Sequence, residues 1–232
     1  MAVANFDVIA TGSTNLNAIA ANFLVWYAAG PADVGNQTRS VLGSAALPED
    51  LAGAAAAFLD ANPRSAGNGA LMRTAPVALA ALEDRSEIAR LAGSMVSLTD
   101  AHPNSVVACV LWSLAIQEAI TTAEPHRAFD WETVVRNGLP HVTKDRQGKW
   151  DKLITEAVTG PPGLSNRNGW VVTAFQPALS AIVNVSVSEE QQADHLRDGL
   201  IVAVKIGDDT DTVAAIAGAL LGARWGLSAI PR

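Results

Sequence analysis

The sequence of 232 residues has one cysteine and no recognisable export signal. Cys109 has no partner for an intramolecular disulfide, and the apolar stretch SVVACVLWSLAI around it predicts a buried, inert thiol rather than a nucleophile. The first residues, MAVANFDVIATG, lack a basic segment and carry Asp7 within their apolar part, which excludes a typical signal peptide. We therefore expect a cytoplasmic protein.

Basic residues are also scarce, with 16 Lys and Arg against 23 Asp and Glu and a net charge of −7. A chain of this kind has no obvious basic face for a phosphate backbone, which disfavours nucleic acid as a partner. The uncharged run over residues 213 to 223 is shorter than the roughly 20 apolar residues that a membrane span needs. Small ligands remain open as partners.

Strand patterns and internal repeats are absent as well. No segment alternates polar and apolar residues, whereas helical spacing recurs along the chain. We predict one all-α domain over residues 1–232 with roughly ten helices. Asn15 or Asn17 is expected to cap one helix, and Pro103 is expected at the start of another. Residues 144–149 are interpreted as an exposed link. The main helices are predicted at residues 1–10, 18–28, 47–61, 85–98, 129–137, 149–158 and 171–183.

Three carboxylates stand close together before the last helix, in the segment KIGDDTDTVAAIAG. Asp208, Asp209 and Asp211 alternate there with Thr210 and Thr212, and like charges at this spacing repel one another. One acid or threonine would suffice to cap the helix. Several hard oxygen donors on one turn can instead bind Mg²⁺ or Mn²⁺. The spacing alone leaves both interpretations open.

The helix that follows is rich in alanine and glycine. Gly218 and Gly222 each cost about 1 kcal/mol relative to alanine inside a helix, which suggests a packing reason for keeping them. Small side chains let neighbouring helices approach closely. We therefore predict a central, buried helix.

A second unusual stretch is RSAGNGALMRTAPVALAAL, which places glycines on both sides of Asn68 before an apolar helix. Gly67 and Gly69 would allow a sharp turn whose free N–H groups face an anion. The earlier turn PADVGNQTRSVL offers further polar groups, and we interpret it as an ordinary turn and helix cap. His102 precedes Pro103 at a helix start, where a histidine is often only a solvated polar group.

Taken together, SAGNGALMRTAP and GDDTDTVAAIAGALLGARWG resemble the ADP-ribosylglycohydrolase family. The segments DVGNQTRSVL, TDAHP and NGWVV support a resemblance over essentially the whole chain, closest to the subgroup similar to dinitrogenase reductase activating glycohydrolases. The resemblance implies an all-α fold around two Mg²⁺ or Mn²⁺ ions. It also implies hydrolysis of the bond that joins ADP-ribose C1″ to a modified protein side chain or small acceptor.

Site residues follow from the same resemblance. The metal motif of the family falls on Asp209, Asp211 and Thr212, of which the two aspartates are also the expected catalytic residues, while Asp208 stands where many members have a second glycine. The resemblance also assigns residues to substrate binding. The loop that binds the diphosphate and the distal ribose falls on Ser65, Gly67, Asn68 and Gly69. A histidine of the nucleotide cleft falls on His102, and an aromatic wall position falls on Trp170.

One motif of the family is absent from this sequence, the T-D-D-T segment that forms the other half of the metal site, together with an acidic flap residue. Since MAVANFDVIATG matches what normally follows that motif, we expect the natural reading frame to extend upstream of Met1. The chain as written is then expected to hold at most one weakly bound ion and to hydrolyse slowly or not at all.

Three functions follow for comparison. The first is a metal-dependent hydrolase, acting as a monomer on an ADP-ribosylated protein or an ADP-ribose-containing small molecule. The second is a catalytically impaired ADP-ribose-binding module. The third is a helical interaction protein, against which the intact GDDTDT motif argues.

Overall fold

The computed structural model describes residues 1–123, 129–161, 167–186 and 192–230. These residues form eleven α-helices and five short 3-10 helices. No strand occurs among them, and their only β-type pairing is an isolated bridge between Gly67 and Trp170. The prediction of an all-α fold is confirmed.

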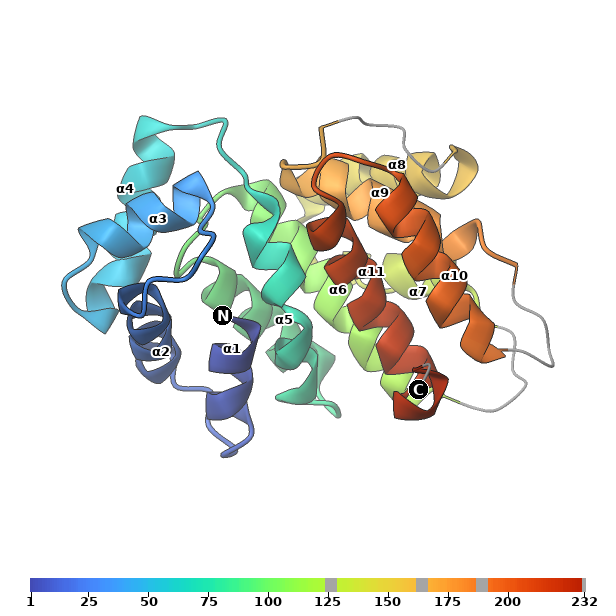
Figure 1. The fold of residues 1–232 in the computed structure, drawn as a ribbon, viewed down its shortest axis with the longest axis horizontal. Helices are drawn as coiled ribbons and strands as arrows, with labels where there is room; N and C mark the ends of the chain where they lie inside the picture. The colour runs from blue at the N-terminus through green and yellow to red at the C-terminus, as the bar shows by residue number, and fades with distance from the viewer. Residues whose placement is uncertain (124–128, 162–166, 187–191, 231–232) are drawn as a thin grey trace.

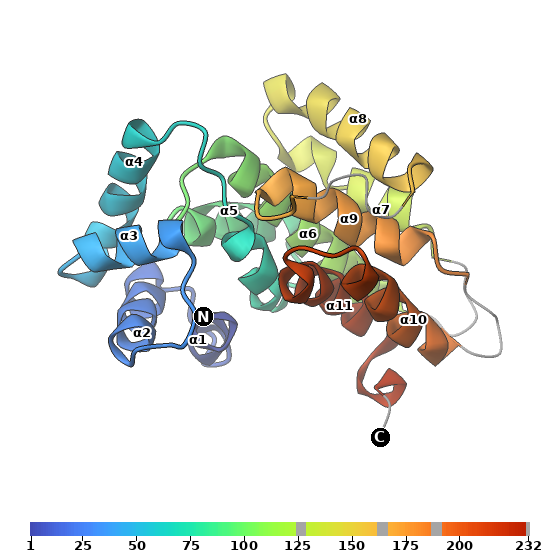
Figure 2. The same cartoon turned by 45° about the horizontal axis from the view of Figure 1, so that its top comes forward.

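The helices form two groups that lie side by side. The first group contains α1 (Ala2–Ile9), α2 (Leu16–Ala28), α3 (Asn36–Ser44) and α4 (Leu51–Ala61). The second contains α6 (Pro103–Thr121), α7 (Trp131–Arg136), α8 (Lys144–Thr159), α9 (Val171–Val183), α10 (Gln192–Lys205) and α11 (Thr210–Trp225). α5 (Arg85–Val96) lies between the two groups, which stay apart in both views of the ribbon (Figures 1 and 2).

The second group is built around α6, which runs beside α11 (Figure 1). The indole N–H of Trp112 donates to the carbonyl of Ile216 at 3.0 Å, and its ring meets Phe175 of α9 edge to face with centroids 5.1 Å apart. α6 is long and apolar enough to cross a membrane by length and composition alone, but core helices pass the same test, and 78% of its apolar window is buried in the fold. Cys109 is buried on this helix, and burial raises the pKa of its thiol to about 12, so its side chain is inert as predicted.

α11 packs against α6, α9 and α10, which confirms the prediction of a central helix. Its two glycines differ in their surroundings. A Cβ added at Gly218 would lie 3.1 Å from a terminal methyl of Leu200, whereas a Cβ at Gly222 would meet nothing within 4 Å. The packing reason expected for both glycines therefore applies only to Gly218.

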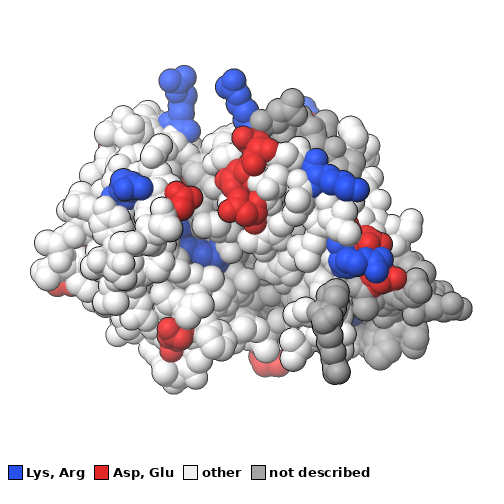
Figure 3. Space-filling model, viewed as in Figure 1, with Lys and Arg blue, Asp and Glu red and all other residues white. Residues whose placement is uncertain are grey.

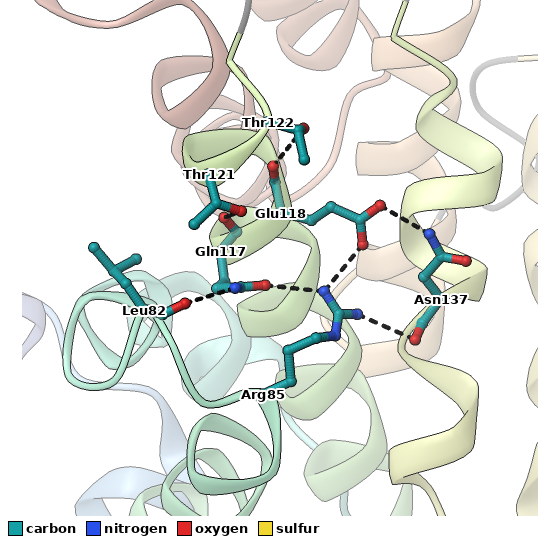
Figure 4. A network of polar contacts seen from close by, with 7 residues as sticks. All are labelled: Leu82, Arg85, Gln117, Glu118, Thr121, Thr122 and Asn137. Atoms are coloured by element: carbon teal, nitrogen blue, oxygen red, sulfur yellow. Dashed lines mark hydrogen bonds and ion pairs between the residues drawn. The ribbon is translucent and has the colours of Figure 1, made fainter.

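A polar network fixes the end of α6 to its neighbours (Figure 4). The guanidinium of Arg85, at the start of α5, donates to Gln117 at 2.9 Å and forms an ion pair of 3.0 Å with Glu118. The same guanidinium reaches the carbonyl of Asn137 after α7, and the Gln117 amide donates to the carbonyl of Leu82. Because these contacts join three segments at one place, they hold α5 and α7 in register on α6.

Several predicted boundaries are confirmed. Asn15 caps α2, accepting from the N–H groups of Asn17 and Ala18, and Pro103 is the first residue of α6. The predicted apolar helix after the glycines was wrong in kind, because η2 (Asn68–Arg73) and η3 (Ala75–Leu79) are both 3-10 helices. Pro76 explains the break, since it lacks an N–H and disfavours α-helical geometry in the residue before it.

The exposed link predicted at residues 144–149 was also wrong. These residues are the first turns of α8, which begins at Lys144. Charged side chains on the solvent face of a helix give the same local composition as an exposed link. The burial of Trp150 and Ile154 further along α8 favours the helix, because it anchors one face of the segment in the core.

The contrast between the two glycines of α11 predicts opposite responses to alanine. Gly222→Ala should raise the free energy of unfolding by about 0.5–1 kcal/mol, since alanine has the higher helix propensity and its Cβ meets open space. Gly218→Ala is the matched control, and crowding against Leu200 should cancel or reverse its gain. Urea unfolding of both variants measures the difference. Equal stabilisation by the two would contradict close packing at Gly218.

Candidate functional site

A cavity of about 630 Å³ lies between the two groups of helices. In the face shown by Figure 3, acidic side chains flank a hollow at this place. The first group contributes the start of α3, and the second contributes the start of α11. The polar residues that line it include Gln37, Ser65, Asn68, Arg73, Thr99, Asp100, Asp209, Asp211 and Thr212, together with Gly67 and Gly69.

The acid turn, defined here as residues 207–212, forms one wall. Asp209 is the N-cap residue of α11, yet its side chain makes no capping hydrogen bond. Instead, its Oδ2 accepts from the Asn68 amide at 2.6 Å. Asp211 follows in the first turn, and the buried Thr212 donates its hydroxyl to the sulfur of Met72 at 3.6 Å. The Asp209 carboxylate therefore does not act as the cap of α11.

The backbone of the acid turn is strained. Gly207 has a φ of +90° and Asp208 a φ of +62°, so two successive residues adopt left-handed conformations. Such a conformation costs on the order of 1 kcal/mol or more for a residue with a side chain. It persists only where surrounding contacts hold it, and these contacts come from Asn168.

Asn168 lies at the centre of the site and is fully buried. Its side-chain oxygen accepts from the N–H of Asp209 at 2.8 Å, and its amide donates to the carbonyl of Gly207 at 3.0 Å. Its backbone N–H donates to Asp208 Oδ2 at 2.9 Å, and its carbonyl accepts from the Asn68 amide at 2.8 Å. Asn168 thus bonds to three residues of the acid turn and to Asn68 of the glycine turn.

The glycine turn, defined here as residues 65–69, lines the cavity next to the acid turn. Neither Gly67 nor Gly69 has a positive φ, so the turn does not use the freedom that the sequence suggested. Its N–H groups are not all free either. Gly67 donates to Gln37 Oε1 at 3.2 Å, and Asn68 donates to the carbonyl of Gly169 at 3.2 Å. Both acceptors are remote in sequence, which is why local patterns could not reveal them.

A buried cation lies behind the glycine turn. Arg73 is 4% exposed, donates to the hydroxyl of Thr99 and stacks over the Phe23 ring at 5.5 Å. Burial lowers its pKa to about 10, so it stays charged at neutral pH. Burial also raises the pKa of the neighbouring Asp100, which accepts hydrogen bonds from the Ser105 hydroxyl and the His102 N–H. Among the residues that the structure describes, Arg73 forms no ion pair within 4.0 Å.

Two predicted site residues lie outside the cavity wall. The Nδ1 of His102 accepts from the N–H of Asn104 at 3.1 Å, so the imidazole caps α6. Burial lowers the pKa of His102, which favours its neutral form. Trp170 is 38% exposed and pairs its backbone with Gly67 through the isolated bridge. The other predicted residues, Ser65, Gly67, Asn68, Gly69, Asp209, Asp211 and Thr212, meet at the cavity.

The donors of the acid turn suit a hard divalent cation. Asp209, Asp211 and Thr212 offer two carboxylates and a hydroxyl at one cavity wall, and Mg²⁺ is commonly held by one or two carboxylates with water completing its octahedral shell. Among the described residues, no group of three or more His, Cys, Asp or Glu side chains is gathered as a metal site. The side chains present therefore fit one cation and not a closed protein cage.

Sequence reasoning missed three residues that build the site, Gln37, Arg73 and Asn168. Gln37 lies in the DVGNQT turn, which we had interpreted as an ordinary turn and which instead lines the cavity. Asn168 begins the NGWVV segment, and its type and position carry no chemical signal of their own. Arg73 did carry one, because a single charge inside the apolar run GALMRTAPVA is typical of a buried, paired or functional group.

A family model described as ADP-ribosylglycohydrolase matches residues 1–232. The ADP-ribosylarginine hydrolase Tri1 of Serratia proteamaculans (strain 568) is 26% identical over 86% of this chain and 49% of its own length. The ADP-ribosyl-[dinitrogen reductase] glycohydrolase of Rhodospirillum rubrum is 27% identical over 97% of this chain and 66% of its own. This chain thus spans about half the length of the Tri1 protein and two thirds of the glycohydrolase.

A solved structure titled ADP-ribosylglycohydrolase-related protein complex superimposes with a TM-score of 0.71. The match covers 99% of this chain and 71% of that one at 22% sequence identity. At this identity the likeness establishes the fold.

The contacts of Gln37 predict that this residue holds the glycine turn. Its Oε1 accepts from the Ser65 hydroxyl at 3.0 Å and from Gly67, and its amide donates to the carbonyl of Thr99 at 3.3 Å. Gln37→Leu keeps the shape but leaves these groups without partners, which should lower the free energy of unfolding by about 1–3 kcal/mol.

Urea unfolding measures this loss. The control is Gln147→Leu on α8, which removes a single hydrogen bond, to the carbonyl of Val142, away from the cavity. A loss at Gln37 no larger than that at Gln147 would mean that the glycine turn does not depend on Gln37.

Proposed function

The chain belongs to the ADP-ribosylglycohydrolase family, and we propose that it binds an ADP-ribosylated substrate in this cavity and hydrolyses the bond at ADP-ribose C1″ with the help of a divalent cation. The names of the relatives support this activity, since both act on ADP-ribosylated groups. The acceptor released would be a protein side chain, with arginine favoured by the name of the Tri1 protein.

One observation carries the proposal. The glycine turn and the acid turn line the same cavity and are joined directly by the hydrogen bond from Asn68 to Asp209, across 141 residues of sequence. Only this juxtaposition lets a single ligand contact both turns. ADP-ribose has two chemically different parts, a diphosphate and a terminal ribose. The diphosphate would match the glycine turn, and the ribose would match the acid turn.

The positive groups at the glycine-turn wall suit the diphosphate. The buried guanidinium of Arg73 lies beside Gly69, and the first turn of α3 presents N–H groups of a helix N-terminus at the same wall. A helix N-terminus and a buried cation both favour an anion, and their effect is strong where water is excluded. These local groups can attract an anion although the whole chain has a net charge of −7.

The carboxylates of the acid turn suit the reacting end. Asp209, Asp211 and Thr212 would hold a Mg²⁺ or Mn²⁺ ion, which supplies a Lewis acid for the ribose hydroxyls and lowers the pKa of the attacking water. Asp211 is exposed at the cavity wall, so its carboxylate can accept a hydrogen bond from that water. In the overall reaction, the hydroxyl of water bonds to C1″, the bond from C1″ to the acceptor breaks, and the acceptor leaves with a proton.

An ADP-ribose-binding module without turnover is the second candidate. The observation that favours it is that no group of three or more His, Cys, Asp or Glu side chains is gathered as a metal site among the described residues. The glycine turn and Arg73 would bind ADP-ribose in either case. Only the dependence on a cation separates the two functions.

Calorimetry with ADP-ribose, in EDTA and then with Mn²⁺, tests the proposal. We expect binding that tightens when Mn²⁺ is added. Asn68→Ala should weaken this binding by about fivefold to tenfold, because it removes an amide worth roughly 1 kcal/mol that also orients Asp209. Equal binding with and without Mn²⁺ would favour the binding module. Absence of any binding would remove both candidates.

The reaction itself is tested at Asp211. Asp211→Asn should abolish release of ADP-ribose from an ADP-ribosylarginine substrate, because a neutral amide cannot replace an anionic ligand or proton acceptor. Its thermal unfolding should change little, since the side chain is exposed and no hydrogen bond of it is recorded among the described residues. Asp151→Asn, on the exposed face of α8, is the control. Wild-type turnover in Asp211→Asn at saturating Mn²⁺ would exclude this carboxylate from the mechanism.

A further inference from the structure

We propose that Asn168 is a positioning residue that aims the carboxylate of Asp209 into the cavity and thereby sets the affinity of the acid turn for a divalent cation. This role rests on the proposed cation at the acid turn. It concerns a residue that neither the family resemblance nor the comparisons assign to the site. Asn168 makes hydrogen bonds both to the acid turn and to Asn68 of the glycine turn.

The carboxamide of Asn168 is shaped to hold the turn that precedes α11. Its oxygen accepts the N–H of Asp209, and its nitrogen donates to the carbonyl of Gly207, at 2.8 and 3.0 Å. These two bonds bracket Asp208, the residue with the left-handed backbone. Because the side chain is fully buried, water cannot substitute for either bond when it is lost.

The same residue also orients the partner of the carboxylate. The amide nitrogen of Asn68 donates both to the backbone carbonyl of Asn168 and to Asp209 Oδ2, at 2.8 and 2.6 Å. Asn168 therefore fixes the backbone of Asp209 directly and its side chain through Asn68. With Oδ2 engaged, Oδ1 has no hydrogen-bond partner within the described part of the chain and is the oxygen left for a cation.

The arrangement corresponds to a familiar division of labour at metal sites. Residues that hold a ligand by hydrogen bonds, without touching the metal, commonly change metal affinity by about 10–100-fold when they are substituted. Asn168 meets that description, since its own oxygen and nitrogen atoms are both used by the turn. A residue that only stabilised the fold would change the stability and leave the intrinsic cation affinity of the folded protein unchanged.

The experiment is a Mn²⁺ titration followed by electron paramagnetic resonance of the free ion, on the whole chain without substrate. We expect Asn168→Ala to weaken Mn²⁺ binding at least tenfold. The matched control is Asn184→Ala at the end of α9, which removes amide bonds to the carbonyl and hydroxyl of Ser180 and should leave the affinity unchanged. Circular dichroism establishes that each variant is folded, and Asn168→Ser replaces the alanine variant if that one is not.

A conservative variant separates positioning from plain stability. Asn168→Asp keeps an oxygen that can accept the N–H of Asp209 but loses the donor to Gly207. We expect its Mn²⁺ affinity to stay clearly above that of Asn168→Ala, even if its melting temperature falls as far. Equal loss of affinity in the Asp and Ala variants would assign Asn168 a structural role only.

The remaining outcomes are also decisive. Unchanged Mn²⁺ affinity in Asn168→Ala would overturn the inference, and so would a wild-type chain that binds no Mn²⁺, because no cation would then depend on the position of Asp209. A wild-type chain that binds Mn²⁺ with the expected dependence on Asn168 but releases no ADP-ribose would support the inference and contradict the proposed hydrolysis. The two proposals can thus fail separately.

Discussion

The hydrogen bond from Asn68 to Asp209 is the contact on which the rest of the site depends. It joins residues 141 positions apart at a distance of 2.6 Å. A bond to a carboxylate is charge-assisted and stronger than one between neutral groups. Asn68 belongs to η2 and Asp209 is the N-cap residue of α11, so the bond fixes the glycine turn and the acid turn relative to each other. The packing of α11 against η2, α6 and α9 supplies the rigid support that keeps the two groups within reach.

Charge is distributed unevenly around the cavity, and this matters more than the net charge of −7. The acid turn places Asp209 and Asp211 at the cavity, and the buried Arg73 lines it behind the glycine turn with Asp100 nearby. The pKa of Arg73, about 10, keeps it protonated at neutral pH. A low-dielectric wall strengthens the field of each group within the cavity. A ligand with one anionic end and one end bound to a cation would match the groups at this cavity. The acidic composition disfavours a long phosphate backbone such as nucleic acid, but it does not exclude a single nucleotide bound at this place.

The sequence predicted the parts of this site that depend on unusual residue types. Three aspartates within four positions and two glycines around Asn68 stand out in any chain, and both turns do line the cavity. Asn168 and Gln37 could not be predicted in this way, because Asn and Gln are common in loops and their importance here comes from partners 40 and 30 residues away. The glycine turn shows the same limit, since its N–H groups are engaged by acceptors that only the fold brings near. Helix existence followed from periodicity, whereas the 3-10 geometry around Pro76 and the start of α8 depended on tertiary packing.

The acid turn is stabilised by groups of the protein itself. Two nearby carboxylates repel each other. The N-terminus of α11 stabilises each well-placed acid by about 0.3–1 kcal/mol, which offsets part of this repulsion. The Asn68 amide also stabilises the charge on Asp209 by donating a hydrogen bond to it. Asn168 stabilises the left-handed backbone of Asp208 through hydrogen bonds to the residues on either side, Gly207 and Asp209. The protein's own groups therefore position Asp209. Binding of the proposed cation would then require little reorganisation, and its strength would be set by how many oxygens face the cavity without a hydrogen-bond partner.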